Sequence, residues 1–401
     1  MTTRTTTAPR LPALPRSRRL VGVDAARGLA LIGMMAAHLL ERYDFDGNPS
    51  LVYPLADGRP SALFAVLAGV GLALVDGGHE GPRIGYGRMV GRTAVRAAVI
   101  LVIGLLLASL ELLPVAVILQ YYALAFLLLA PLLRLPTAVL AGGGLLWMVT
   151  VPFLSHAVRA GADLLGPGPQ VGFARLVSDP GGSLTDLFLT GYYPVLSWFG
   201  YLLVGAAVGR LALTRAPVVL ALTGVGLLLT VGAWLTSRVL LGTAAAQAAL
   251  AEPDPLTGRG PDGPWFGTTP TSSWWWLAVD TPHTATPPDL LGTTGSALLV
   301  IGACLLLART VAGWALLPLA AAGSMTLTLY TVHVLAATYY WPGISPVTDW
   351  TVHTVVALVF ASVWVLRFRR GPLEAATAAL VDMAAGPSRD AEPTPRATAA
   401  R

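Results

Sequence analysis

The 401-residue chain contains no lysine, so arginine supplies all 26 of its basic side chains. It has one cysteine, Cys304, which excludes a disulfide within the chain and a cysteine metal site. Charged residues make up only 12% of the sequence, about half the share typical of soluble globular domains. Hydrophobic residues reach 55%, and the mean hydropathy is +0.67. This composition predicts a multi-pass membrane protein.

Long apolar windows recur from residue 20 to residue 369 and predict an all-α domain of ten transmembrane helices. The expected spans are 20–40, 60–77, 94–111, 114–133, 136–153, 192–212, 217–240, 290–308, 311–336 and 351–368. Residues 1–18 are expected to form a disordered cytoplasmic tail, and 19–370 the membrane domain. In 371–401, a short amphipathic stretch from Leu373 to Met383 would precede a second disordered tail.

Ten spans place both termini on one side of the membrane, and the distribution of arginine identifies that side. With the termini in the cytoplasm, the tails and inner loops contain 19 arginines and the outer loops contain six. The positive-inside rule therefore predicts cytoplasmic termini in a plasma-membrane protein. The rule also accounts for the pI of about 9.6 without nucleic acid as a partner. The lipid bilayer is the expected partner, and the oligomeric state, a homodimer included, is left open.

The expected first span carries titratable groups at both ends. Asp24 and Arg27 lie near its start, and His38 follows 14 residues after Asp24. That separation is about 21 Å along a helix. Titratable groups inside an apolar span are costly, so they indicate a functional site. The alternative is that Asp24 and Arg27, at i and i+3, only neutralise each other near the headgroups.

Several polar side chains are expected near the outer ends of spans, where they would share one cavity. Glu41 follows His38 by three residues, and such a pair can orient an imidazole as a general base. For each residue alone, the alternative is an ordinary interhelical hydrogen bond. The remaining candidates are Asp57 and Arg59 before the second span, His283 before the eighth, His333 in the ninth, and Gln120 and Tyr121 in the fourth.

Two expected outer loops, 154–191 and 241–289, are long enough to be functional lids. The second contains Trp274, Trp275 and Trp276 in succession. Trp275 is a candidate for stacking on a sugar ring. The alternative is an aromatic belt, because tryptophans gather at membrane interfaces in unrelated proteins.

The expected inner loop 83–92 is the best candidate for an anion site in the sequence. It holds Arg83, Arg88 and Arg92 among glycines, and Arg96 follows. Such arginines can grip phosphates, although orientation in the membrane alone also places arginines there. No metal is predicted, because the sequence has no His-x-x-x-His or Glu-x-x-His pair.

Five short stretches together resemble the transmembrane acyltransferases related to heparan-α-glucosaminide N-acetyltransferase, in particular their bacterial members. Residues 23–31, Val-Asp-Ala-Ala-Arg-Gly-Leu-Ala-Leu, are similar to the Asp-x-x-Arg-Gly opening of that family. The other stretches are 59–69, 191–198 with Gly205 and 209–210, 282–283 with 295–297, and 323–330.

The resemblance implies transfer of an acetyl or similar acyl group from cytoplasmic acetyl-CoA to an amine or hydroxyl outside the cytoplasm. The acceptor would be a glycan or lipid-linked sugar of the cell envelope. The donor would be held near Asp24, Arg27, Arg88 and Arg92. The family's active site includes an asparagine in the first span and a histidine soon after it. Here His38 stands in the asparagine's place and residues 45–48 hold no histidine, so His38 is the expected general base.

Two other functions fit the same residues. A transporter or flippase for an envelope precursor would line its path with these polar groups, although no inverted repeat is readable in the sequence. A non-catalytic membrane partner would keep the fold without the chemistry. Donor binding and acyl transfer are the properties that separate the three.

Overall fold

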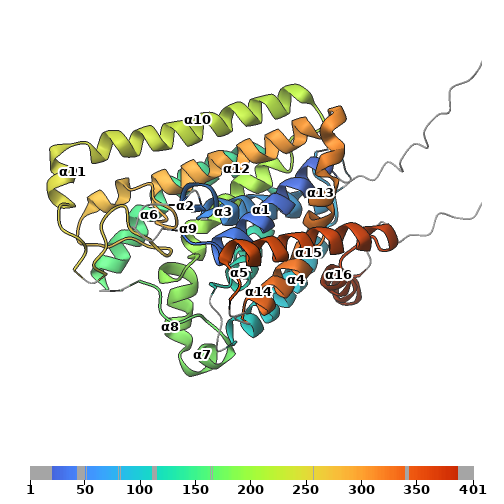
Figure 1. Ribbon diagram of the computed structural model, residues 1–401, viewed down its shortest axis with the longest axis horizontal. Coiled ribbons are helices and arrows are strands. Elements are labelled where there is room, and N and C mark those ends of the chain that lie inside the picture. The colour runs from blue at the N-terminus through green and yellow to red at the C-terminus, as the bar shows by residue number, and fades with distance from the viewer. Residues whose placement is uncertain are drawn as a thin grey trace, which may run out of the picture.

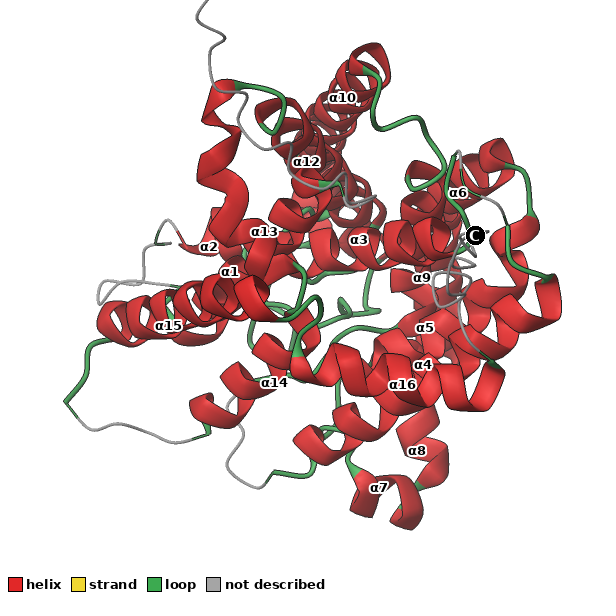
Figure 2. Ribbon diagram, turned by 90° about the vertical axis from the view of Figure 1, so that its right-hand side faces the viewer, coloured by secondary structure: helices red, strands yellow, loops and turns green. Residues whose placement is uncertain are grey.

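The computed structural model is described for residues 20–42, 50, 52–79, 81, 83–110, 115–162, 164, 166–255, 257–338 and 343–386. The expected tail 1–18, the segment 45–48 and residues 387–401 lie outside this part of the chain. Within the described ranges every regular element is a helix and none is a strand (Figures 1 and 2). The expected all-α class is therefore confirmed.

The helices, in chain order, are α1 (Val21–Leu39), α2 (Val52–Ala56), α3 (Arg59–Val75), α4 (Tyr86–Ala108), α5 (Leu119–Leu129), α6 (Thr137–Gly161), α7 (Phe173–Ser178), α8 (Pro180–Thr185), α9 (Val195–Val208), α10 (Ala216–Leu241), α11 (Ala244–Ala249), α12 (Pro287–Leu307), α13 (Leu317–Gly323), α14 (Thr326–Ala337), α15 (Pro346–Arg367) and α16 (Pro372–Ala385). Four short helical segments complete the set, η1 (Ala130–Arg134), η2 (Asp186–Thr190), η3 (Trp274–Ala278) and η4 (Val311–Leu316).

Among the described residues, five helices are long and apolar enough to cross a membrane, namely α4, α6, α10, α12 and α15. The number rises to seven if each of two bent helix pairs is one span. Each of the expected spans falls on a helix or a bent pair. The expected ninth span is such a pair, because the chain turns by 70° between α13 and α14.

The start of α4 corrects one expectation. The segment around Arg88 and Arg92 is helical from Tyr86 onward, so these arginines lie on the first turns of a helix and not in a flexible glycine-rich loop. A Cβ at Gly87 or Gly91 would meet nothing within 4 Å, so neither glycine serves a turn or a close approach. The surrounding arginines have good helix propensity, and the helix tolerates both glycines.

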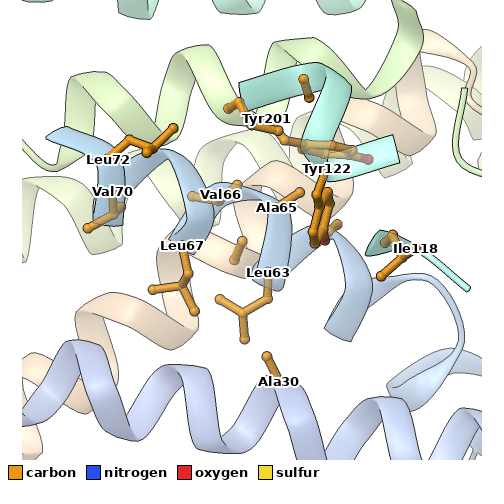
Figure 3. Packing of buried hydrophobic residues seen from close by; sticks show 14 of the residues in the cluster. Ala30, Leu63, Ala65, Val66, Leu67, Val70, Leu72, Ile118, Tyr122 and Tyr201 are labelled. Atoms are coloured by element: carbon orange, nitrogen blue, oxygen red, sulfur yellow. The ribbon is translucent and has the colours of Figure 1, made fainter. Parts of the chain in front are cut away.

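Glycine allows α1 and α3 to approach their neighbours at backbone distance. A Cβ at Gly28 of α1 would overlap the carbonyl oxygen of Leu319 in α13, and one at Gly69 of α3 would overlap that of Leu202 in α9. Small residues at such crossings are typical of helices packed in membranes. Figure 3 shows the resulting core, with Leu63 of α3 on the side of Ala30 in α1.

The expected amphipathic stretch forms α16, which packs on α4 and α14. One carboxylate oxygen of Glu374 accepts the backbone N–H groups of Leu327 and Thr328, at 2.7 and 3.1 Å. The other accepts the Thr328 hydroxyl at 2.6 Å. The first turn of a helix leaves its N–H groups without backbone partners, so Glu374 caps α14 at the 70° bend.

Candidate active site

Three histidines from three helices form a continuous chain at the end of α1. The Nδ1 atom of His38 lies 3.0 Å from Nε2 of His333 in α14. The Nδ1 atom of His333 lies 2.7 Å from Nδ1 of His353 in α15. The chain ends at Asp349, whose carboxylate is 3.5 Å from Nε2 of His353 and stands four residues earlier on α15.

The Asp349 carboxylate sets the direction in which hydrogen bonds are donated along this chain. An ionised carboxylate only accepts, so it favours the proton of His353 on Nε2 and leaves Nδ1 as an acceptor. His333 then donates from Nδ1 and accepts at Nε2, and His38 donates from Nδ1. The remaining ring nitrogen of His38, Nε2, then carries a lone pair and has no hydrogen-bond partner among the described residues. His38 is partly exposed, whereas His333 is buried.

A second cluster lies beside the first, centred on Asp57 between α2 and α3. Its Oδ1 atom is 3.2 Å from the Arg42 guanidinium and 3.4 Å from Nε2 of His283. Neither contact has hydrogen-bond geometry, so both are electrostatic. The Arg42 guanidinium also lies 5.6 Å from the centroid of the Phe266 ring. The loop before α12 therefore closes over this cluster.

Burial alone would raise the pKa of Asp57, whose side chain is 4% exposed. The neighbouring basic groups outweigh this effect. His283 contributes most and Arg42 next, so the pKa of Asp57 is held below its usual value. Asp57 is therefore an anion that binds the two basic groups in place.

His283 occupies a strained backbone position. Its φ of 61° is in the left-handed region, as is the φ of 52° at Ala285. Non-glycine residues in this region cost about 1–3 kcal/mol and persist where the surroundings enforce them, often at functional sites. The His283 ring packs between Tyr193, at 5.8 Å between centroids, and Trp198, at 6.4 Å.

Arginines gather at the opposite end of α1. Arg27 forms an ion pair with Asp24 at 3.0 Å, so the mutual neutralisation considered from the sequence does occur. Arg92 forms an ion pair with Asp382 of α16 at 2.8 Å and also donates to the carbonyl of Gly386. Arg96 lies within electrostatic range of Arg27, Arg92 and Arg370. No ion pair involves Arg96 in the part of the chain that is described.

The structure separates several residues that the sequence suggested together. Because α1 ends at Leu39, helical spacing does not bring Glu41 onto the face of His38; Glu41 is exposed, and the partner of His38 is His333. Arg88 is exposed on α4. Arg59 lines a separate cavity between α10 and α12.

The polar residues of α5 are buried. Gln120 is 1% exposed, and its side-chain carbonyl oxygen has no hydrogen-bond partner among the described residues. The Tyr121 ring meets Tyr193 edge-on at 5.6 Å and so reaches the surroundings of His283. Trp275 is partly buried against a small loop core containing Trp265 and Trp276.

Sequence reasoning missed His353 and Asp349. Their i, i+4 spacing places both on one face of a helix, and this spacing is the feature of the sequence that could have identified the pair. Arg42 was also missed, because nothing in its local sequence points to Asp57. Among the described residues, no three or more His, Cys, Asp or Glu side chains are grouped to hold a metal ion.

The family model described as heparan-alpha-glucosaminide N-acetyltransferase, catalytic, matches residues 19–232, which is just over half of the chain. The chain belongs to the family related to heparan-alpha-glucosaminide N-acetyltransferase. Residues 265–383 match a second family model, described as a protein of unknown function (DUF418). No curated protein matches the chain.

The two matched regions of this N-acetyltransferase-related chain meet in the site. His38, Asp57 and Arg96 come from the first region, and His333 and His353 come from the second. The short contacts His38–His333 and Asp57–His283 both join the two regions. The site is therefore complete only when both are present.

Replacing Asp57 with Asn should destabilise the protein, because Arg42 and His283 lose a buried anion. The expected cost is about 1.5–3 kcal/mol above pH 5. Since the pKa of Asp57 is lowered on folding, its stabilising effect is present above the unfolded pKa and fades as the pH falls below about 4. The measurement is the thermal midpoint of detergent-solubilised wild type and Asp57→Asn from pH 3 to pH 8. A midpoint difference that does not change with pH would contradict an anionic role.

Proposed function

We propose that this chain is a membrane-embedded acyltransferase that moves an acetyl or similar acyl group from acyl-CoA to an amine or hydroxyl across the membrane. The acceptor is a glycan or a lipid-linked sugar of a bacterial envelope. The family supports a membrane acetyltransferase. The observation that carries the proposal is the histidine chain, because it directs the Nδ1 proton of His38 toward His333 and leaves the lone pair on Nε2, at one end of α1.

The base in this mechanism is Nε2 of His38. It takes the proton from the acceptor nitrogen or oxygen as that atom attacks the thioester carbonyl carbon. The new C–N or C–O bond forms, the C–S bond breaks, and the thiolate of CoA leaves. A neutral imidazole accepts a proton at its unprotonated ring nitrogen, which is the role of a general base. The positive charge that develops on His38 is shared along the chain toward the Asp349 carboxylate.

The donor binds at the other end of α1 in this proposal. Arg96 and its neighbours Arg27, Arg92 and Arg370 give an excess of positive charge suited to the phosphates of CoA. The rise from Asp24 to His38 along α1 is about 21 Å. An extended pantetheine arm spans a distance of this order, so the thioester would reach His38 while the nucleotide stays at the arginines.

The remaining features of the proposal concern topology. Ten spans with cytoplasmic termini would put the arginines inside and His38 outside a plasma membrane. Residues 19–370 would then be the membrane domain, with α16 on its cytoplasmic face. A homodimer is compatible with this arrangement.

Replacing His38 with Ala should stop transfer while donor binding persists. General-base catalysis contributes about 10²–10⁴-fold, so the rate should fall by at least about 100-fold. The measurement is transfer of radiolabelled acetyl groups by purified protein in nanodiscs, with equilibrium binding of acetyl-CoA measured in parallel. His79→Gln, in the loop after α3, is the matched control and should behave as wild type. Failure of the wild type to bind acetyl-CoA would overturn the donor assignment and leave the transporter or non-catalytic partner.

Asp349 acts as a positioning residue in this mechanism, because it sets the tautomers and never reaches the acceptor. Asp349→Asn supplies an amide that can donate to His353 and reverse the whole chain, so kcat should fall about tenfold or more with KM for acetyl-CoA unchanged. The acidic limb of the pH–rate profile should shift, and Asp349→Glu should restore much of the rate. Equal losses in Asn and Glu variants with an unshifted profile would mean that Asp349 only supports the fold.

Replacing Arg96 with Gln should weaken donor binding, because its guanidinium forms no ion pair among the described residues and lies close to three other arginines. Loss of one charge-assisted contact to a phosphate is expected to raise the Kd for acetyl-CoA about tenfold or more. Arg215→Gln, at the exposed N-cap of α10, is the matched control. A Kd for acetyl-CoA that is unchanged within twofold in Arg96→Gln would rule out this cluster as the phosphate site.

A further inference from the structure

A polar cavity of about 270 Å³ lies between α10 and α12, beside the first residue of α3. Its polar lining comes from Arg59, Thr230, Asp280, Asp289 and Thr293, and Trp234 adds an aromatic ring. The histidine chain and the arginine cluster contribute no residue to it. The cavity is therefore a second polar site within an apolar helix pair.

Three titratable side chains, Arg59, Asp280 and Asp289, line the cavity. Asp289 is 6% exposed, and its Oδ2 atom accepts the backbone N–H of Ala285 at 3.0 Å. Among the described residues no ion pair joins Asp289 or Arg59 to an opposite charge. Asp280 reaches Arg238 only at 3.8 Å. Burying a carboxyl group is costly unless its oxygen atoms accept hydrogen bonds, so a ligand that donates hydrogen bonds to Asp289 is favoured.

The size and the charges of the cavity restrict the ligand. A volume of about 270 Å³ is below that of pockets for drug-sized molecules and suits one sugar ring. Two acids accept from hydroxyl donors, and the guanidinium of Arg59 donates to hydroxyl or ring oxygens. With acids and a base on the same wall, a neutral hydroxyl-rich ring fits better than a phosphate or a carboxylate. Trp234 offers a flat apolar surface for that ring.

The cavity opens toward the side of the helix bundle. Val231 and Trp234 of α10 border it and are 43% and 51% exposed. Only 22% of the apolar window of α10 is buried inside the protein, so the rest of this span faces lipid. Figure 1 shows α10 along the edge of the bundle, with α12 between it and α1. A ligand reaches the cavity from within the bilayer.

The cavity is also next to the Asp57 cluster. The turn Asp57-Gly58-Arg59 places Asp57 beside His283 and Arg59 in the lining of the cavity. Gly58 has a φ of 74°, which glycine adopts without strain, and this allows the turn. Asp289 lies within electrostatic range of His283. The cavity and the histidine chain thus flank the same cluster.

We infer that this cavity binds the single neutral sugar headgroup of a membrane-anchored glycolipid, with the lipid tail lying along α10. The inference deepens the proposed function, on which its acceptor role rests: the acceptor is then lipid-linked and approaches sideways, not a soluble glycan from the aqueous side. Binding of the headgroup itself depends only on the cavity.

The test uses the full chain in phosphatidylcholine nanodiscs and an alkyl β-glucoside with a photoactivatable diazirine in its alkyl chain. Peptides of α10 should be labelled, and octyl β-glucoside should compete far better than free glucose. Arg59→Gln and Asp289→Asn should each weaken labelling about tenfold, the loss expected for one charge-assisted hydrogen bond. Because Asp289 also supports the local backbone, the exposed Arg59 provides the variant that keeps the fold. His79→Gln, at an exposed position outside both the cavity and α10, is the control and should label as wild type.

The outcomes separate the two proposals. Equal labelling of wild type and Arg59→Gln would overturn the cavity as the headgroup site. Competition by free glucose equal to that by octyl β-glucoside would overturn the lipid anchor and indicate a soluble sugar. Headgroup-dependent labelling in a protein that binds no acetyl-CoA would retain the cavity ligand and overturn the acyltransferase.

Discussion

Helix α1 packs against α13 at backbone distance, and this contact determines where the two ends of α1 lie. Two glycines, Gly28 in α1 and Gly323 in α13, bring the backbones into contact, and any Cβ at either position would overlap a carbonyl group. This contact fixes α1 lengthwise and in rotation. It thereby places Arg27 among the arginines at one end and His38 against His333 at the other. A single rigid helix sets the separation between the two ends of the candidate site.

Composition and hydropathy predicted the helical class and the approximate helix positions, because burial of apolar spans leaves a strong signal in the sequence. The 70° bend between α13 and α14 left no such signal, since the apolar run continues across it. The helical start of α4 was likewise hidden, because arginines and glycines there suggest a loop as readily as a helix. Hydropathy identifies apolar segments but does not predict where a helix within such a segment breaks.

The candidate site was predicted in part. His38, Asp57, His283 and His333 were expected at the same ends of their helices, and the structure brings them into two adjacent clusters. Their pairing could not be predicted, because His38 and His333 are 295 residues apart and only tertiary packing joins them. Glu41 failed as the partner of His38 for a local reason, the end of α1 at Leu39. His353 and Asp349 carried a readable i, i+4 pattern, but its meaning depends on a neighbour in another helix.

The small helix α16 is needed to hold two other helices of the bundle in place. Its two ends hold different parts of the bundle: Glu374 caps the first turn of α14, and Asp382 holds Arg92 on α4. A chain cut after α15 would lose both attachments at once, leaving two N–H groups of α14 without an acceptor and Arg92 without its carboxylate. The helix that carries His333 is therefore anchored by residues that follow the last expected span, and α16 packs as part of the folded helix bundle.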